Sequence, residues 1–234
     1  MEKLSSNQTI RAIAVNAVIA AVSLFINGFG IYLTMLAGIG AAPWDVFNLG
    51  LSKTFGILYG TASIAVSVTI LIIDIILREP IGFAMMIDAI VVGKSVDFFN
   101  YMNLLKTPDT LVGKIALLIL GMFIIGYTQL FYMKASLGCG PRDTLLVGIK
   151  KRAAKVPIGV IGIAILGTAT LIGYLLGGPV GIGTILCAAL QGPIMQLAFF
   201  TLHFDATKIN HQNFISSFGV IGRRVRYHFR GKRA

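Results

Sequence analysis

The chain has 234 residues, of which 56% are hydrophobic and 12% are charged, and its formal net charge is +11. Soluble domains usually contain about 25% charged residues, so the composition excludes an ordinary soluble globule and indicates a membrane protein. The basic residues flank apolar stretches and form no separate basic domain, so we expect no nucleic-acid partner. The two cysteines and three histidines lack metal-ligand spacing, which predicts no metal site, no cofactor and no disulfide framework.

Six apolar stretches are long enough to cross a bilayer, which takes about 20 helical residues. They lie at residues 12–37, 57–77, 81–99, 115–133, 156–176 and 180–202. Two further helical segments, at 44–54 and 142–152, are too short to cross, because eleven residues reach only about 16 Å. A basic tail follows over residues 203–234. The sequence therefore predicts an all-α membrane protein with six transmembrane helices and two half helices.

A glycine–proline–aspartate motif occurs twice, at 40–50 and again at 138–148. The matching residues, each 98 positions apart, are Pro43 with Pro141, Asp45 with Asp143, Gly50 with Gly148, and, earlier in each copy, Gly28 with Gly126. At a spacing of 99, Pro80 matches Pro179 and Gly93 matches Gly192. This register predicts an internal repeat, with a first copy over residues 1–105 and a second over 106–202.

Each predicted copy contains three spans, so the second copy enters the membrane upside down relative to the first. Basic residues concentrate in the tail and in the 134–155 segment, which the positive-inside rule places on the cytoplasmic side, together with both termini. Inverted repeats with short helices at matching positions are typical of secondary transporters.

The motif itself predicts a loop followed by the start of a helix. Glycine permits the turn, proline suits the first helical position, and an aspartate in the first turn suits the helix N-terminus. Asp45 and Asp143 therefore have two interpretations: they cap helix amides, or they line a polar pathway. As pathway candidates we select Pro43, Trp44, Asp45, Asn48, Asp88, Pro141, Arg142 and Asp143.

Other polar residues lie within the predicted spans, where ionisable groups are costly. Asp88 is the deepest, and its repeat partner is Cys187. Lys94 and Asp97 are three residues apart, which predicts a local ion pair. Asp74 lies near the end of its span and is expected to reach water. Asn27 is expected to form an interhelical hydrogen bond.

Three functions fit these features. The first is a secondary transporter or permease of a small molecule or ion. The second is the substrate-binding membrane component of a vitamin importer, and the third is a non-transporting scaffold with a basic cytoplasmic face. No nucleophile–base constellation, P-loop or paired-histidine motif occurs, so we expect no enzyme. The expected partners are the bilayer, anionic lipid at the tail and an unidentified solute, with homo-oligomerisation left open.

The twin motif, at residues 38–45 and 138–143, resembles that of the YczE/YyaS/YitT family of bacterial integral membrane proteins. The resemblance covers about residues 10–202. It implies a polytopic protein of the bacterial plasma membrane and supplies no established catalytic residues. Because the chain has only a short tail, it is more similar to the YczE-like members than to the YitT-like ones.

Overall fold

The computed structural model describes residues 6–79, 83–134 and 140–203, and within them it forms eight helices and no strand. The helices are α1 (Ser6–Leu36), α2 (Pro43–Phe55), α3 (Tyr59–Ile76), α4 (Phe83–Met102), α5 (Leu111–Lys134), α6 (Pro141–Arg152), α7 (Ile158–Leu175) and α8 (Ile182–Thr201). The all-α prediction is confirmed. Residues 204–234, which include nearly all of the predicted basic tail, lie outside the described residues.

Five of the described helices are long and apolar enough to cross a membrane. They are Val15–Leu36, Tyr59–Ile76, Leu111–Lys134, Ile158–Leu175 and Ile182–Thr201. They correspond to five of the six predicted spans. The remaining predicted span, at residues 81–99, corresponds to α4. This helix has 20 residues but carries the ionisable side chains of Asp88, Lys94 and Asp97.

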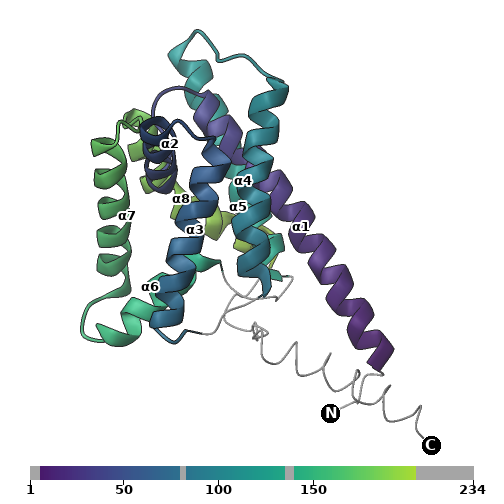
Figure 1. Cartoon of the computed structure of the whole chain (residues 1–234). Coiled ribbons are helices and arrows are strands. Elements are labelled where there is room, and N and C mark those ends of the chain that lie inside the picture. Colours follow the sequence, from purple (N-terminus) through teal and green to yellow (C-terminus); the bar gives the residue numbers. More distant parts are fainter. Residues whose placement is uncertain (1–5, 80–82, 135–139, 204–234) are drawn as a thin grey trace, which may run out of the picture.

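The two short helices lie at opposite ends of the bundle. Figure 1 shows α2 near one end and α6 near the other, and we call these the α2 end and the α6 end. With 13 and 12 residues, the two helices are about 20 and 18 Å long, short of a hydrocarbon core of about 30 Å. Both begin at a proline that follows an extended residue, as the motif predicts.

The centre of the bundle is a close crossing of α1 and α5. A Cβ atom added at Gly121 would lie 2.6 Å from the carbonyl oxygen of Gly30, so only glycine permits this approach of the two backbones. About one turn along α1 from Gly30, the Asn27 amide donates a hydrogen bond to the Thr128 hydroxyl of α5 at 3.0 Å. The interhelical hydrogen bond predicted for Asn27 is confirmed.

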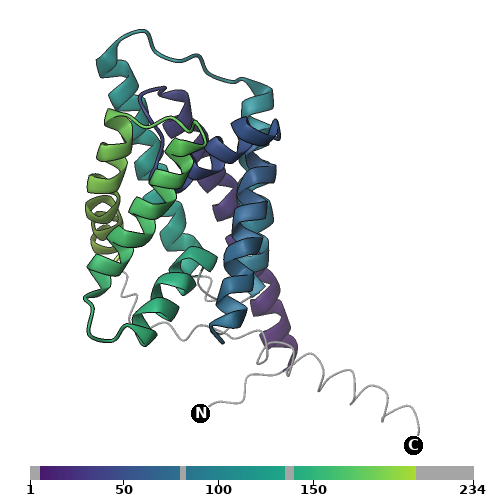
Figure 2. The same cartoon turned by 60° about the vertical axis from the view of Figure 1, so that its left-hand side comes forward.

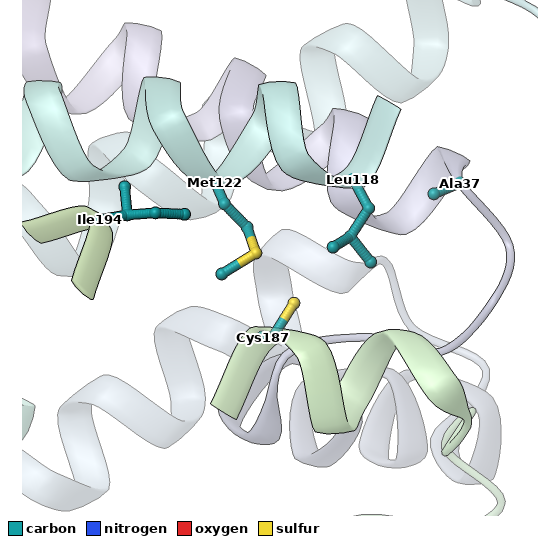
Figure 3. Close-up of a cluster of buried hydrophobic side chains, with 5 residues drawn as sticks. All are labelled: Ala37, Leu118, Met122, Cys187 and Ile194. Carbon is teal, nitrogen blue, oxygen red and sulfur yellow. The ribbon is translucent and has the colours of Figure 1, made fainter. Parts of the chain in front are cut away.

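The central helices α1 and α5 each pack against one further helix. Gly28 of α1 packs against Ser95 of α4, and Gly126 of α5 packs against Ile194 of α8. An apolar cluster fills the second contact: it consists of Ala37, Leu118, Met122, Cys187 and Ile194, and Figure 3 shows the Cys187 sulfur pointing toward Met122. Cys187 is therefore an apolar packing residue, although its repeat partner is Asp88.

The segment between α1 and α2 is fixed against the beginning of α8. Gly38 and Gly40 have φ angles of +66° and +112°, which residues with a side chain rarely adopt. The Ala41 amide donates to the Pro179 carbonyl at 3.2 Å, and the Gly183 amide donates to the Ile39 carbonyl at 2.8 Å. These bonds position the N-terminus of α2 inside the bundle.

Candidate functional site

The N-termini of the two half helices face a common centre. Ala42 and Gly140, which precede α2 and α6, have extended backbones and no side-chain cap hydrogen bond. The partial positive charge of each helix end is therefore not neutralised by its own capping residue. Pro43 and Pro141 are buried and begin the two helices at this centre.

Trp44 and Arg142 occupy matching positions of the two motif copies, and the structure brings them into contact. The Arg142 guanidinium lies 5.0 Å from the centroid of the Trp44 ring, a cation–π arrangement. The two half helices, 98 residues apart in sequence, thus meet through their first turns. The sequence identified both residues but did not predict that they touch.

Asp45 is held by α3 and not by its own helix. The Tyr59 hydroxyl donates a 2.7 Å hydrogen bond to Asp45 Oδ1, and the Asn48 amide donates to the Tyr59 oxygen at 3.4 Å. Asp45 is 4% exposed and Asn48 is fully buried. Among the described residues Asn48 Oδ1 has no hydrogen-bond partner, so this buried network retains one free acceptor.

The other two carboxylates lie against the beginning of α6. A Cβ atom at Gly140 would lie 3.3 Å from Asp88 Oδ2 and 3.8 Å from Asp143 Oδ2, so α4 and α6 meet at this glycine. Asp88 is half-buried, whereas the Asp143 side chain is accessible. Arg142 interacts electrostatically with Asp45, Asp88 and Asp143. We call Trp44, Asp45, Asp88, Arg142 and Asp143 the polar centre.

An apolar cavity of about 820 Å³ adjoins the polar centre. Its wall comes from α2, α3, α6 and α7 and from Val156, just before α7, and apart from Trp44 its only side chains with a polar group are Thr69 and Thr168. Trp44 lines this cavity and also contacts Arg142. The indole ring therefore separates an apolar space from a group of charged side chains.

The C-terminal ends of the half helices make matching contacts. At the α2 end, Lys53 donates to the Gly177 carbonyl at 3.4 Å and Thr54 to the Leu176 carbonyl at 3.0 Å. At the α6 end, Lys151 bonds Glu79 at 2.5 Å and Arg152 donates to the Leu77 carbonyl. Each half helix thus binds the C-terminal end of a long helix: α2 binds α7, and α6 binds α3.

Two expectations about ionisable residues are wrong. Asp97 forms no ion pair with Lys94; its Oδ1 instead accepts the Gly60 amide proton of α3 at 2.8 Å, because a free helix N-terminus is a better-placed donor than a solvated lysine. Asp74 does not reach water: it is fully buried, and neither carboxylate oxygen has a hydrogen-bond partner among the described residues.

Tyr59 is the member of the site that sequence reasoning missed. It is 5% exposed and stands at the first position of α3, one short turn after α2. A polar aromatic residue at the beginning of an apolar span is the only sequence signal for it. That signal is weak, because interfacial tyrosines are common at such positions.

A family model described as a family of unknown function, DUF6198, matches residues 14–199. The chain belongs to this family. Two relatives are Bacillus subtilis proteins, the uncharacterized membrane protein YczE and the uncharacterized protein YyaS. YczE is 33% identical over 178 residues, covering 75% of this chain and 81% of YczE. YyaS is 27% identical over 180 residues, covering 75% of this chain and 88% of YyaS.

A third relative, an uncharacterized protein of Haemophilus influenzae, is 30% identical over 174 residues, covering 74% of this chain and 78% of the relative. No solved structure matches the chain. The predicted resemblance to the YczE/YyaS family is confirmed. The matched region contains all five apolar helices except for the last residues of α8, so the family assignment and the composition together identify a membrane protein.

Proposed function

We propose that this member of the YczE/YyaS family is a secondary transporter of a small solute, built from two inverted repeats. Residues 1–105 form the first repeat and residues 106–202 the second, and α4 serves as a sixth span. The proposal assigns the chain no catalytic role. The polar centre is the proposed substrate site.

Matching contacts support the inverted repeat. The contacts of α1 with α4 recur in α5 with α8, and those of α2 with α7 recur in α6 with α3. The hydrogen bond from Thr54 to Leu176 corresponds to the one from Arg152 to Leu77 when residues are shifted by 98 or 99 positions. The half helices lie at opposite ends of the bundle, as an inversion requires (Figure 1).

The observation that carries the transport proposal is the contact between Trp44 and Arg142. It places the N-termini of both half helices at one point in the interior, beside three carboxylates. Irregular backbone at membrane depth is tolerated where it is buried in protein or lines a water-filled cavity. Substrate sites of inverted-repeat transporters form from such discontinuous helices at the interface between the repeats.

The positive-inside rule supports an orientation with the α6 end in the cytoplasm. Lys150, Lys151, Arg152 and Lys155 lie at or just after the C-terminus of α6. We therefore place the protein in the bacterial plasma membrane with both termini cytoplasmic. The tail, by its composition, would bind anionic lipid of the inner leaflet.

Reconstituted vesicles test this function. Purified protein would be screened with small organic ions and neutral solutes for uptake above that of protein-free vesicles. Asp45→Asn and Asp143→Asn should each reduce uptake at least tenfold while the protein still inserts and remains monodisperse, because each removes a carboxylate from the polar centre.

Asp109→Asn is the matched control, since Asp109 is exposed in the segment between α4 and α5 and should retain full uptake. Full uptake in both Asp45→Asn and Asp143→Asn would contradict the assignment of the site. If none of the screened solutes enters the vesicles, the result would favour a scaffold over a transporter.

A further inference from the structure

The seam between α3 and α4 is closed by a pair of glycines. A Cβ atom at Gly93 would lie 2.8 Å from the carbonyl oxygen of Gly60, so the two backbones touch at this point. Beside them, Asp97 Oδ1 accepts the Gly60 amide proton at 2.8 Å. Tyr59 and Val96 continue the contact in one buried cluster. Gly60, Gly93 and Asp97 thus form a packed and hydrogen-bonded latch, which we call the first latch.

The same residue pattern recurs 99 positions later, as Gly159, Gly192 and Gln196. We call these three residues the second latch. Gln196, like Asp97, carries a side-chain oxygen that can accept an amide proton. The second latch therefore contains the same types of group that pack and hydrogen-bond in the first latch.

In the structure the second latch is open. Apart from the neighbouring backbone of its own helix, a Cβ atom added at Gly159 or at Gly192 would meet no described atom within 4 Å. The close packing that joins α3 to α4 has no equivalent between α7 and α8, although only residues 176–181 connect those helices. Figure 2 shows this connection at the α2 end of the bundle.

The two half helices also differ in how closely they pack on their long helices. At the α2 end, a Cβ at Gly173 would lie 2.5 Å from the Phe47 amide nitrogen, so α2 packs backbone to backbone on α7. The position that matches Gly173 in the first copy is Asp74, which carries a side chain where Gly173 has none. The contact of α6 with α3 is accordingly less extensive than that of α2 with α7.

We propose that the two latches close alternately, and that this structure is the state closed at the α2 end and open at the α6 end. In the other state Gly159 packs on Gly192, the Gln196 oxygen accepts the Gly159 amide proton, and the first latch separates. The proposal rests on the inverted repeat of the proposed function. Exchanging one latch for a matching one keeps the two states close in free energy, which a two-state transporter requires.

The chemistry of the latches also accounts for which state is observed. A hydrogen bond to a carboxylate is about twice as strong as one to a neutral amide. The Asp97 Oδ1 bond to the Gly60 amide is therefore stronger than a Gln196 bond to the Gly159 amide would be, although Asp97 Oδ2 is buried without a hydrogen-bond partner among the described residues. Asp97→Asn should raise the population of the opposite state about fivefold, the ratio that corresponds to about 1 kcal/mol.

Spin-label distances in lipid nanodiscs test the exchange. One pair, Thr61→Cys with Tyr101→Cys, reports on the first latch, and the matching pair 99 residues later, Val160→Cys with Phe200→Cys, reports on the second. Tyr101 and Phe200 are 85% and 80% exposed and Thr61 and Val160 are also exposed, so labels there should not disturb packing. Cys139→Ser and Cys187→Ala remove the native thiols.

We expect mainly the short distance in the first pair and mainly the long distance in the second, with a minor population exchanged in both. Asp97→Asn should increase both minor populations together. Gly192→Leu should remove the minor short distance of the second pair, because its side chain would fill the seam. Gly167→Leu, at another open glycine of α7, is the control and should change neither distribution.

A second pair that keeps one long distance, both with native Asp97 and in Asp97→Asn, would overturn the alternating latches. So would a short distance that disappears on dilution with unlabelled protein, since it would arise between two copies. These distances are measured without substrate, so a failure of the latch proposal can be told apart from a failure of the transport proposal. Exchanging distances in a protein that moves no solute would contradict transport alone, whereas a fixed distance in a transporting protein would contradict the latches alone.

Discussion

At the scale of single residues, the polar centre depends on partners from distant parts of the chain. Asp45 is held by the Tyr59 hydroxyl, Arg142 by the Trp44 ring, and Asp88 lies against Gly140. The interpretation of Asp45 as a helix cap is not the one that the structure favours, because its hydrogen bond goes to a side chain of α3. The Tyr59 hydroxyl and the nearby Arg142 stabilise the buried Asp45 carboxylate, which can still accept further hydrogen bonds.

Tyr59→Phe tests the strength of this arrangement. Removing the hydroxyl leaves Asp45 Oδ1 buried without its donor, so the free energy of unfolding should fall by about 1–3 kcal/mol. Unfolding in mixed micelles, followed by circular dichroism, measures the change. Tyr174→Phe is the matched control, because Tyr174 is 61% exposed and its replacement should cost less than about 0.5 kcal/mol. Equal stability of the two variants would contradict a structural role for the hydroxyl.

At the scale of helices, glycines determine which elements approach each other. Gly30 and Gly121 bring α1 onto α5, Gly60 and Gly93 bring α3 onto α4, and Gly173 brings α7 onto α2. In lipid, helices associate through close packing and not through hydrophobic burial, so these glycines carry much of the specificity. Glycines without a neighbour, such as Gly159 and Gly192, are then the informative exceptions.

Two glycine variants in α7 compare a packed position with an open one. Gly173→Ala should destabilise the protein by about 1–3 kcal/mol, because the new methyl group meets the backbone of Phe47 and Val46, which cannot move aside. Gly167→Ala should be neutral or stabilise by up to about 1 kcal/mol, since nothing lies within 4 Å and alanine favours the helix. Thermal unfolding of both variants in one detergent measures the difference in stability. A larger loss of stability in Gly167→Ala than in Gly173→Ala would show that α7 packs differently.

At the scale of the whole molecule, the two half helices make matching contacts, but the two latches differ in packing. The half helices bind the ends of α7 and α3 through matching hydrogen bonds, yet the first latch is closed and the second is open. In the proposed inverted repeat, each element has a counterpart of similar local sequence in the opposite orientation. Under that proposal, the differences between counterparts describe the conformational state of the protein.

Thiol labelling tests the proposed orientation in intact cells. With the native cysteines replaced, Lys106→Cys, between α4 and α5 at the α2 end, should react with a membrane-impermeant maleimide added outside. Lys155→Cys, just after α6, should react only after the cells are opened, because the six proposed spans would put these two sites on opposite sides. Reaction of both from the same side would contradict six spans and would indicate that α2 and α6 cross the membrane completely.

The sequence by itself determined the local features of this protein. Composition and the length of the apolar stretches determined an all-α membrane class, because apolar side chains and satisfied backbone bonds are what a bilayer demands. Proline at Pro43 and Pro141 determined where the half helices begin, because its fixed φ angle and missing amide act within one turn. The register of the predicted repeat likewise depends only on residue spacing, and it stays a prediction.

Only the tertiary structure decided what these features touch. That Tyr59 binds Asp45, that Trp44 meets Arg142, and that Asp74 is buried all depend on contacts between helices distant in sequence, which no local preference encodes. The same holds for the latches. Gly60 and Gly159 occupy matching positions near the beginnings of matching helices, yet one is packed and the other is open, because packing is a property of the conformation that the whole bundle adopts.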